Sequence, residues 1–151
     1  MYFIYRVLKS YFFGAFPPKL TWVVTDICNS KCIFCEVPGG FKGKTDCSNE
    51  RALSLCGELR RLGVREVHLV GGEVFLRKDI WEILKALKRL KIRVTITTNG
   101  LAFDSFDKEK RRILTECVDR LRFSLDSTIQ EEYDRIRGVN GAFNKISVAI
   151  E

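Results

Sequence analysis

Residues 20–35 read Leu-Thr-Trp-Val-Val-Thr-Asp-Ile-Cys-Asn-Ser-Lys-Cys-Ile-Phe-Cys, an apolar run followed directly by closely spaced cysteines. The first six residues are rich in β-branched and aromatic side chains, which predicts a buried strand. Cys28, Cys32 and Cys35 then follow in a loop at the end of that strand. Three thiolates at this spacing fit three corners of one iron–sulfur cluster and leave the fourth corner open for chemistry.

Other uses of these thiols agree less well with the sequence. A structural zinc site needs a second pair of ligands, whereas Cys47, Cys56 and Cys117 are scattered and His68 is the only histidine. Disulfide frameworks are typical of secreted proteins, and clustered cysteines in a reducing cytosol more often bind metals. Cys47 remains an alternative fourth ligand that would close the cluster. Cys56 is expected to be a core thiol, and His68 a hydrogen-bonded core residue.

Strands and helices alternate along the rest of the chain. Strands are predicted at residues 20–25, 64–70, 92–97 and 121–125, and helices at 48–62, 79–90, 107–117, 129–136 and 142–150. This alternation indicates an α/β fold in which right-handed crossovers build a parallel sheet covered by helices. The apolar strands predict burial on both faces of the sheet. Functional residues of such sheets gather at the C-terminal ends of the strands.

A short motif ends each of the three later strands. These motifs are Gly71-Gly72-Glu73, Thr98-Asn99-Gly100 and Ser124-Leu125-Asp126. Each alone has an ordinary structural explanation, as a glycine turn, an Asn-Gly turn or an Asp helix cap. Ser124 and Asp126 would point to the same side of a strand, since strand side chains alternate. Together with the cysteine loop, the motifs are predicted to meet at one rim of the sheet.

The four motifs in this order resemble the radical S-adenosylmethionine (radical SAM) superfamily, and Phe34 matches the aromatic residue before its third cysteine. The resemblance implies a 4Fe-4S cluster on Cys28, Cys32 and Cys35, with SAM bound through its amino and carboxylate groups at the free iron. An electron from the cluster would cleave SAM into methionine and a 5′-deoxyadenosyl radical. That radical would abstract hydrogen from a substrate, so the resemblance implies an enzyme.

The same resemblance implies a set of SAM contacts. The backbone of Gly71 and Gly72 would approach the methionine end of SAM, since glycine permits close approach. Glu73 would take its amino group, and Val74 stands where the family usually has proline. The remaining implied contacts are Thr98 and Asn99 in the pocket wall, Ser124 and Asp126 at the ribose or the methionine carboxylate, and Arg137, followed by Gly138, at that carboxylate.

The resemblance covers residues 20–151 and includes about four of the six βα units of the family's partial (βα) barrel. We therefore divide the chain into an N-terminal amphipathic helix and linker, residues 1–18, and a radical SAM core, residues 19–151, that is incomplete at its C-terminus. A sheet cut after its fourth strand has an unprotected edge. We expect a fragment or truncated product that folds poorly alone. The alternative function is a non-catalytic iron–sulfur or metal-binding module.

Composition narrows the classes of partner. The net charge of +7 comes largely from predicted helix faces, so no nucleic-acid binding is expected. Residues 1–16 are predicted to form an amphipathic helix that packs on the domain or contacts a membrane surface. Gly43-Lys44-Thr45 resembles the end of a phosphate-binding loop, but Pro38 replaces the first glycine of that motif.

The resemblance to the radical SAM superfamily implies a one-electron donor such as a flavodoxin or ferredoxin, a cytoplasmic location, and a substrate that the sequence does not identify.

Overall fold

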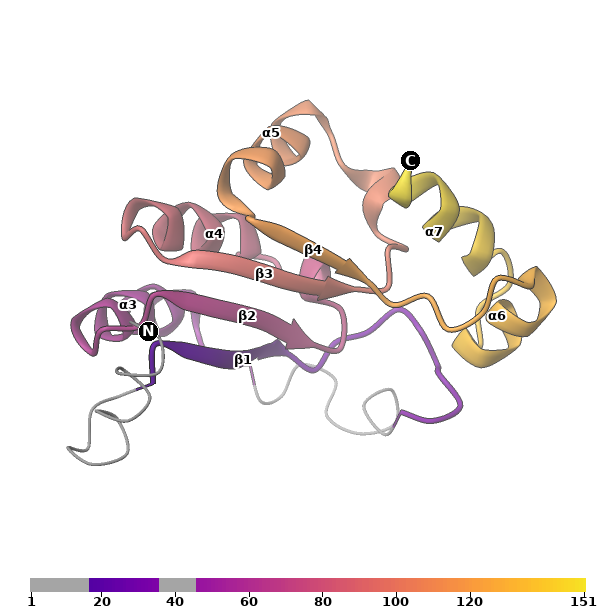
Figure 1. The fold of residues 1–151 in the computed structure, drawn as a ribbon, viewed down its shortest axis with the longest axis horizontal. Coiled ribbons are helices and arrows are strands. Elements are labelled where there is room, and N and C mark those ends of the chain that lie inside the picture. The colour runs from indigo at the N-terminus through magenta and orange to yellow at the C-terminus, as the bar shows by residue number, and fades with distance from the viewer. Residues whose placement is uncertain (1–16, 36–45) are drawn as a thin grey trace, which may run out of the picture.

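The computed structural model describes residues 17–35 and 46–151. The predicted amphipathic helix at residues 1–16 and the glycine-rich segment with Gly43-Lys44-Thr45 lie outside the described residues. The sheet is parallel throughout, in the order β1 (Lys19–Thr25), β2 (Glu66–Gly71), β3 (Arg93–Thr98) and β4 (Arg120–Phe123). Each strand therefore pairs with the strand before it in sequence, as repeated βα crossovers require. The predicted α/β fold is confirmed (Figure 1).

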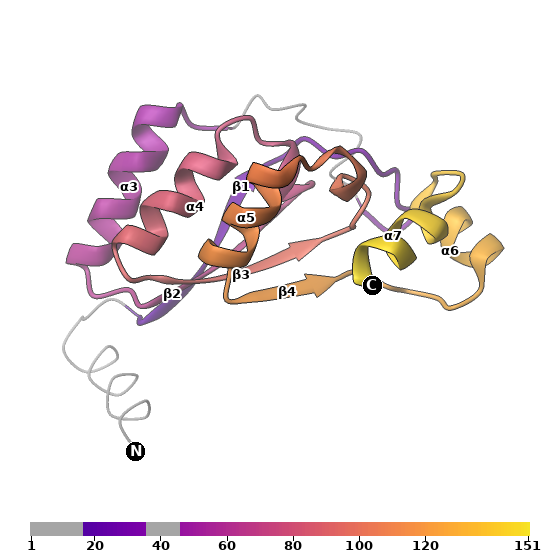
Figure 2. The same ribbon diagram turned by 90° about the horizontal axis from the view of Figure 1, so that it is seen from above.

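In residues 17–35 and 46–151, three helices cover one face of this sheet. Viewed from above, α3 (Asn49–Arg61), α4 (Ile80–Arg89) and α5 (Lys108–Cys117) lie side by side along it (Figure 2). The last two helices, α6 (Gln130–Arg137) and α7 (Ala142–Ile150), lie beyond the C-terminal ends of the strands (Figure 1). Two 3₁₀ turns were not predicted from the sequence: η1 (Val74–Leu76) and η2 (Phe103–Ser105).

The expected burial of both sheet faces is wrong, because the strand side chains alternate between an apolar and a polar face. The apolar side chains pack with the helices in one core and are Leu20, Trp22, Val24, Val67, Leu69, Val94, Ile96, Leu121 and Phe123. Polar residues alternate with them, among them Thr21, His68, Thr95 and Arg122. Val23, on the same face as these polar residues, is 65% exposed. Among the described residues, helices cover one face of this sheet and leave the other, the open face, uncovered.

The helix boundaries follow the capping residues in the sequence. Ser48 accepts a hydrogen bond from the Arg51 amide at the start of α3, as predicted. Asp107 accepts one from the Lys110 amide at the start of α5. Gly63 follows α3 with φ of 86°, a conformation that suits glycine.

Two cysteines belong to the hydrophobic core. Cys56 is fully buried, as predicted, and Cys117 is 5% exposed. Burial raises the pKa of the Cys56 thiol to about 11. These two thiols therefore pack in the core, and their burial disfavours the reactive thiolate form. In residues 17–35 and 46–151, no helix combines the length and the apolar character needed to cross a membrane.

Candidate functional site

A pocket at the C-terminal ends of the strands brings the predicted motifs together. Its volume is about 160 Å³. Nine of the eleven residues predicted from the sequence line it: Cys28, Cys32, Cys35, Gly71, Gly72, Thr98, Asn99, Ser124 and Arg137. Glu73 and Asp126 are the two that do not. Ser30, Phe34, Val70 and Thr97 complete the lining.

The cysteine loop is attached to the end of α6 by backbone hydrogen bonds. The Lys31 amide donates to the Arg137 carbonyl at 2.9 Å, and the Ile33 amide donates to the Ile136 carbonyl at 3.0 Å. Gly138 has φ of 62°, and a Cβ there would lie 2.6 Å from the Lys31 carbonyl oxygen. These contacts use helix carbonyls that would otherwise lack partners. They explain why glycine follows Arg137, a pair that sequence analysis singled out without this reason.

Asn99 ties the turn after β3 to the cysteine loop. Its Nδ2 donates to Asn29 Oδ1 at 2.8 Å and to Ser30 Oγ at 3.1 Å. The same nitrogen lies 3.9 Å from Cys28 Sγ. Burial raises the pKa of Cys28, and the nearby Glu73 carboxylate adds to that rise. Asn99 thus lines the pocket and also holds the first cysteine in place.

Arg137 is buried and reaches the second cysteine. Its Nη1 donates to Cys32 Sγ at 3.4 Å, and its Nη2 donates to the Ser124 carbonyl and pairs with Asp126. The guanidinium carbon lies 5.3 Å from the ring centroid of Tyr133, a cation–π contact. Nε has no partner among the described residues. Both terminal nitrogens of the guanidinium therefore already contact protein groups, so fewer donors remain for the predicted contact with the SAM carboxylate.

Glu73 lies behind the pocket wall and is 1% exposed. Its Oε1 accepts from Thr98 Oγ1 at 2.8 Å and from the Phe75 amide at 3.3 Å, and its Oε2 accepts from the Asn99 amide at 2.8 Å. Burial raises the pKa of Glu73, and these hydrogen bonds oppose that rise. In this structure the carboxylate holds the turn after β3, where sequence analysis expected it to meet the SAM amino group.

Gly71 and Gly72 are required by the chain's own backbone. A Cβ on Gly71 would lie 2.2 Å from the Thr25 carbonyl oxygen, and one on Gly72 would lie 2.3 Å from that of Ile27. The Gly72 amide donates to the Thr25 carbonyl at 2.8 Å, and the Glu73 amide donates to the Ile27 carbonyl at 2.7 Å. The two glycines therefore let the segment that leads into Cys28 cross directly over the end of β2.

The expected strand alternation at Ser124 and Asp126 is wrong, because β4 ends at Phe123. The Leu125 amide donates to the Phe123 carbonyl at 3.2 Å, which turns the chain out of the sheet. Ser124 lines the pocket, whereas Asp126 is exposed and pairs with Arg137. The alternation of side chains in the sequence does not predict this turn, because the turn is formed by a hydrogen bond between backbone groups.

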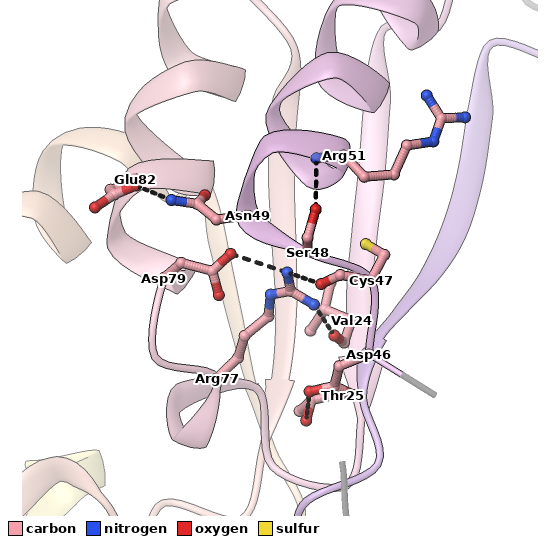
Figure 3. A network of polar contacts seen from close by, with 10 residues as sticks. All are labelled: Val24, Thr25, Asp46, Cys47, Ser48, Asn49, Arg51, Arg77, Asp79 and Glu82. Atoms are coloured by element: carbon pink, nitrogen blue, oxygen red, sulfur yellow. Dashed lines mark hydrogen bonds and ion pairs between the residues drawn. The ribbon is translucent and has the colours of Figure 1, made fainter. Parts of the chain in front are cut away.

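Arg77 is a buried residue next to the start of the cysteine loop, and its role was not predicted from the sequence. It is 4% exposed, and it donates from Nη1 to the Val24 carbonyl at 2.7 Å and from Nη2 to the Cys47 carbonyl at 2.9 Å (Figure 3). Nη2 also pairs with Asp79 at 2.9 Å. This guanidinium thereby fixes the end of β1, from which the cysteine loop starts. The burial of Arg77 is hard to predict from the sequence, because an arginine beside Lys78 is typical of a solvent-exposed surface.

Cys47 lies apart from the candidate pocket. It packs against the core that α3 and α4 share, and it lines a different cavity, with Ile27, Asp46 and Arg77. Thr25 Oγ1 donates to Asp46 at 2.6 Å, which ties this segment to the end of β1 (Figure 3). Cys47 is therefore placed as part of the scaffold and does not join Cys28, Cys32 and Cys35.

The donor set of the pocket fits an iron–sulfur cluster. Cys28, Cys32 and Cys35 all line it. Among residues 17–35 and 46–151, no three His, Cys, Asp or Glu side chains gather tightly enough to hold one metal ion. A cluster takes one thiolate at each of several irons, so its ligands stand apart around it. Separate thiols around one pocket therefore agree with a cluster.

His68 lies on the open face of the sheet and is half-buried, so its predicted place in the core is wrong. Its Nε2 lies 2.7 Å from Thr97 Oγ1, so the predicted hydrogen bonding is present. Thr97 also lines the cysteine pocket. His68 thus belongs to the polar layer next to that pocket.

Comparisons with known proteins agree with this geometry. The family model of the Radical SAM superfamily matches residues 22–151. The chain is 38% identical over 131 residues to a probable GTP 3′,8-cyclase of Thermococcus kodakarensis, covering 85% of this chain and 41% of that protein. It is 30% identical over 147 residues to the mycofactocin maturase MftC of Mycobacterium ulcerans, covering 97% and 39%. The chain thus spans less than half the length of these curated relatives.

The fold matches that of solved structures. SuiB of Streptococcus suis bound to S-adenosylmethionine superposes with a TM-score of 0.73 at 23% identity, covering 97% of this chain and 32% of that one. The structure of anSMEcpe with bound AdoMet superposes with a TM-score of 0.64 at 18% identity, covering 87% of this chain and 38% of that one. At these identities the likeness shows the fold alone, which is that of a partial radical SAM barrel. With its family match over residues 22–151, the chain belongs to the radical SAM superfamily, and this membership implies a 4Fe-4S cluster and SAM as cofactors.

Proposed function

We propose that this chain forms the cluster-binding and SAM-binding part of a radical SAM enzyme that cleaves SAM reductively and abstracts hydrogen from a substrate. The observation that carries the proposal is one pocket lined by Cys28, Cys32 and Cys35 together with the ends of β2, β3 and β4. Residues that are far apart in sequence supply its walls. Such convergence at the C-terminal ends of parallel strands is where α/β proteins bind their ligands.

The proposed roles of the residues follow from their contacts. The three thiols would hold the cluster, and the bound cluster with SAM would supply a 5′-deoxyadenosyl radical. Asn99 and Arg137 hold the loop through contacts with Cys28 and Cys32. Positively charged and amide N–H groups beside cluster thiolates stabilise their negative charge. These residues therefore orient the ligands and adjust the cluster's electron affinity.

The pocket would enclose one end of SAM. Its volume of about 160 Å³ is smaller than the cavities of about 300 Å³ and more that hold drug-sized ligands. Gly71 and Gly72 bring backbone to the wall, and Ser124 adds a short hydroxyl side chain. We place the methionine end of SAM here, since these groups suit its amino and carboxylate groups. The ribose and adenine would extend beyond the described pocket.

The substrate class is a finer proposal. The names of the relatives include a cyclase of GTP, and a SuiB structure is described as bound to a precursor peptide. Phosphates of nucleotides and carboxylates of peptides are both oxyanions, so we propose a substrate that carries such a group. We further propose a flavodoxin or ferredoxin as electron donor and a reducing cytoplasm as the compartment. Free thiols at all six cysteines support that compartment.

The second candidate is a non-catalytic cluster module, which would need a fourth protein ligand in place of SAM. Cys47 is the cysteine that sequence analysis named for this role. Its position with Asp46 and Arg77 in a different cavity favours the enzyme. An open iron is what SAM binding requires, and three cysteines leave one open.

The test is anaerobic reconstitution of the chain with iron and sulfide, followed by EPR spectroscopy of the reduced protein with and without SAM. We expect a reduced 4Fe-4S signal that changes on adding SAM, and formation of 5′-deoxyadenosine. Cys28→Ala should lose the cluster, whereas Cys47→Ala, the matched control, should keep it. Loss of cluster in Cys47→Ala to the same extent would refute the open-iron proposal. A signal that SAM leaves unchanged would favour the cluster module.

A further inference from the structure

Another cavity, separate from the two described above, lies on the open face of the sheet. Its volume is about 310 Å³. Residues from all four strands line it: Lys19, Leu20, Thr21, Glu66, His68, Thr95 and Arg122. Six of these seven residues are polar, and β1 and β2 each contribute two of them at alternate positions, Lys19 with Thr21 and Glu66 with His68. The sheet thus builds a polar cavity on the face opposite its helices.

The charges in this cavity are unequal. Glu66, the only carboxylate among the described residues that line it, pairs with Lys19 at 3.0 Å and with Arg93 at 2.9 Å. The guanidinium of Arg122 forms no hydrogen bond or ion pair with the part of the chain that the structure describes. Its charge acts on His68, where it adds to burial in lowering the histidine pKa. That carboxylate is already compensated by two cations, so Arg122 adds an uncompensated positive charge to the described lining of the cavity.

His68 and Arg122 stand next to the cysteine pocket. Arg122 is the register partner of Thr97, and His68 Nε2 lies 2.7 Å from Thr97 Oγ1. Thr97 lines the cysteine pocket. Val70, which also lines it, follows His68 by two strand residues, a rise of about 6.6 Å. A ligand bound by His68 and Arg122 would therefore reach the cysteine pocket with its other end.

We propose that Arg122 and His68 form an oxyanion subsite that binds a phosphate or carboxylate of the substrate and directs its reacting end toward the cysteine pocket. This proposal rests on the proposed radical SAM function. The guanidinium of Arg122 presents paired N–H donors that match a carboxylate or phosphate. His68 Nδ1 has no partner among the described residues, so it is available as a second contact.

The chemistry of the cavity argues against other ligands. A cation would meet Arg122 and would find Glu66 already paired twice. An apolar group would leave the guanidinium desolvated without a partner, which costs free energy. An oxyanion satisfies Arg122 and uses the same donors that the cavity presents. The strands hold these donors on a rigid scaffold, which favours a defined orientation.

The experiment is an NMR titration of the chain without cluster or SAM, using the ring signals of its only histidine. Inorganic phosphate and acetate are the probes, and sodium chloride at equal ionic strength is the control. We expect a saturable shift of the His68 signals with phosphate, acetate or both. Saturation by phosphate alone assigns a phosphate group, and saturation by acetate assigns a carboxylate. Arg122→Gln should weaken binding about tenfold.

The control variant is Arg112→Gln, which removes the same charge from an exposed position of α5. It should bind the probes as the parent chain does. The proposal is overturned if the parent chain shows no saturable shift, if Arg122→Gln binds equally well, or if Arg112→Gln weakens binding as much. Because the titration uses neither cluster nor SAM, it is independent of the test of SAM cleavage. Failure of either test therefore identifies which of the two proposals is wrong.

Discussion

The buried guanidinium of Arg137 donates from Nη1 to the sulfur of Cys32, 3.4 Å away. These residues are 105 positions apart in sequence. The contact exists because the cysteine loop is attached by backbone hydrogen bonds to the end of α6. A cationic donor to a cluster sulfur stabilises the reduced, more negative cluster. We therefore propose that Arg137 affects electron transfer to the cluster as well as the position of the loop.

The first prediction concerns the reduction potential of the cluster. Arg137→Gln should shift it to a more negative value, because the variant loses a positive charge beside Cys32. The measurement is a redox titration of the reconstituted chain followed by EPR. Arg135→Gln, on an exposed position of the same helix, is the matched control and should leave the potential unchanged. Equal potentials in the parent and Arg137→Gln would contradict this role.

The second prediction concerns Glu73, whose carboxylate accepts from Thr98, Phe75 and Asn99. Glu73→Gln replaces one acceptor oxygen by an NH₂ group, which would face an N–H or O–H donor. We expect the free energy of unfolding to fall by about 1–3 kcal/mol, the cost of an unsatisfied buried polar group. Urea denaturation measures it. Glu116→Gln, on an exposed position, should change stability little. If both variants unfold at the same urea concentration, the carboxylate does not hold this turn.

The sequence predicted the strands and helices well because their signals are local. Ser48 and Gly63 mark the ends of α3, and apolar periodicity marks its inner face. The prediction of a sheet buried on both faces was wrong even though the sequence contained the contrary evidence. Polar Thr21 alternates with Trp22, and polar His68 alternates with Leu69, which is the pattern of a sheet with one polar face.

The partners of the buried polar side chains could not be predicted in this way. Arg77 becomes buried because the Val24 and Cys47 carbonyls meet it, and they do so only once β1 has packed against η1. Glu73 likewise finds its partners on the turn after the neighbouring strand. The motifs identified which residues gather at the site. Their individual contacts depend on tertiary packing that no local pattern encodes.

The third prediction concerns the glycines under the cysteine loop. Gly72→Ala would place a Cβ 2.3 Å from the Ile27 carbonyl oxygen, so the backbone before Cys28 must move. We expect a loss of about 2 kcal/mol or more in the free energy of unfolding, together with reduced cluster incorporation. Gly57→Ala is the matched control, since a Cβ there meets nothing within 4 Å in the middle of α3.

The control should act in the opposite direction. Alanine favours the helix, so Gly57→Ala should raise stability by about 0.5 kcal/mol. Chemical denaturation and iron content per chain measure the two effects. Full cluster loading with parent-like stability in Gly72→Ala would show that the loop tolerates displacement, against the close crossing seen here.

The fourth prediction concerns the titration of His68. Burial lowers its pKa below the ordinary 6.5, Arg122 lowers it further, and Glu66 opposes them. Arg122→Gln should therefore raise the pKa, and Glu66→Gln should lower it, as read from the ring signals of this single histidine against pH. At pH values between the lowered pKa of folded His68 and the ordinary 6.5, the unfolded chain binds more protons than the folded chain. The contribution of His68 to the free energy of unfolding is therefore complete above pH 6.5 and is lost as the pH falls through the folded-state pKa. An unchanged pKa in Arg122→Gln would mean that the charge of Arg122 does not act on His68. The description of charges in the cavity on the open face of the sheet would then be wrong.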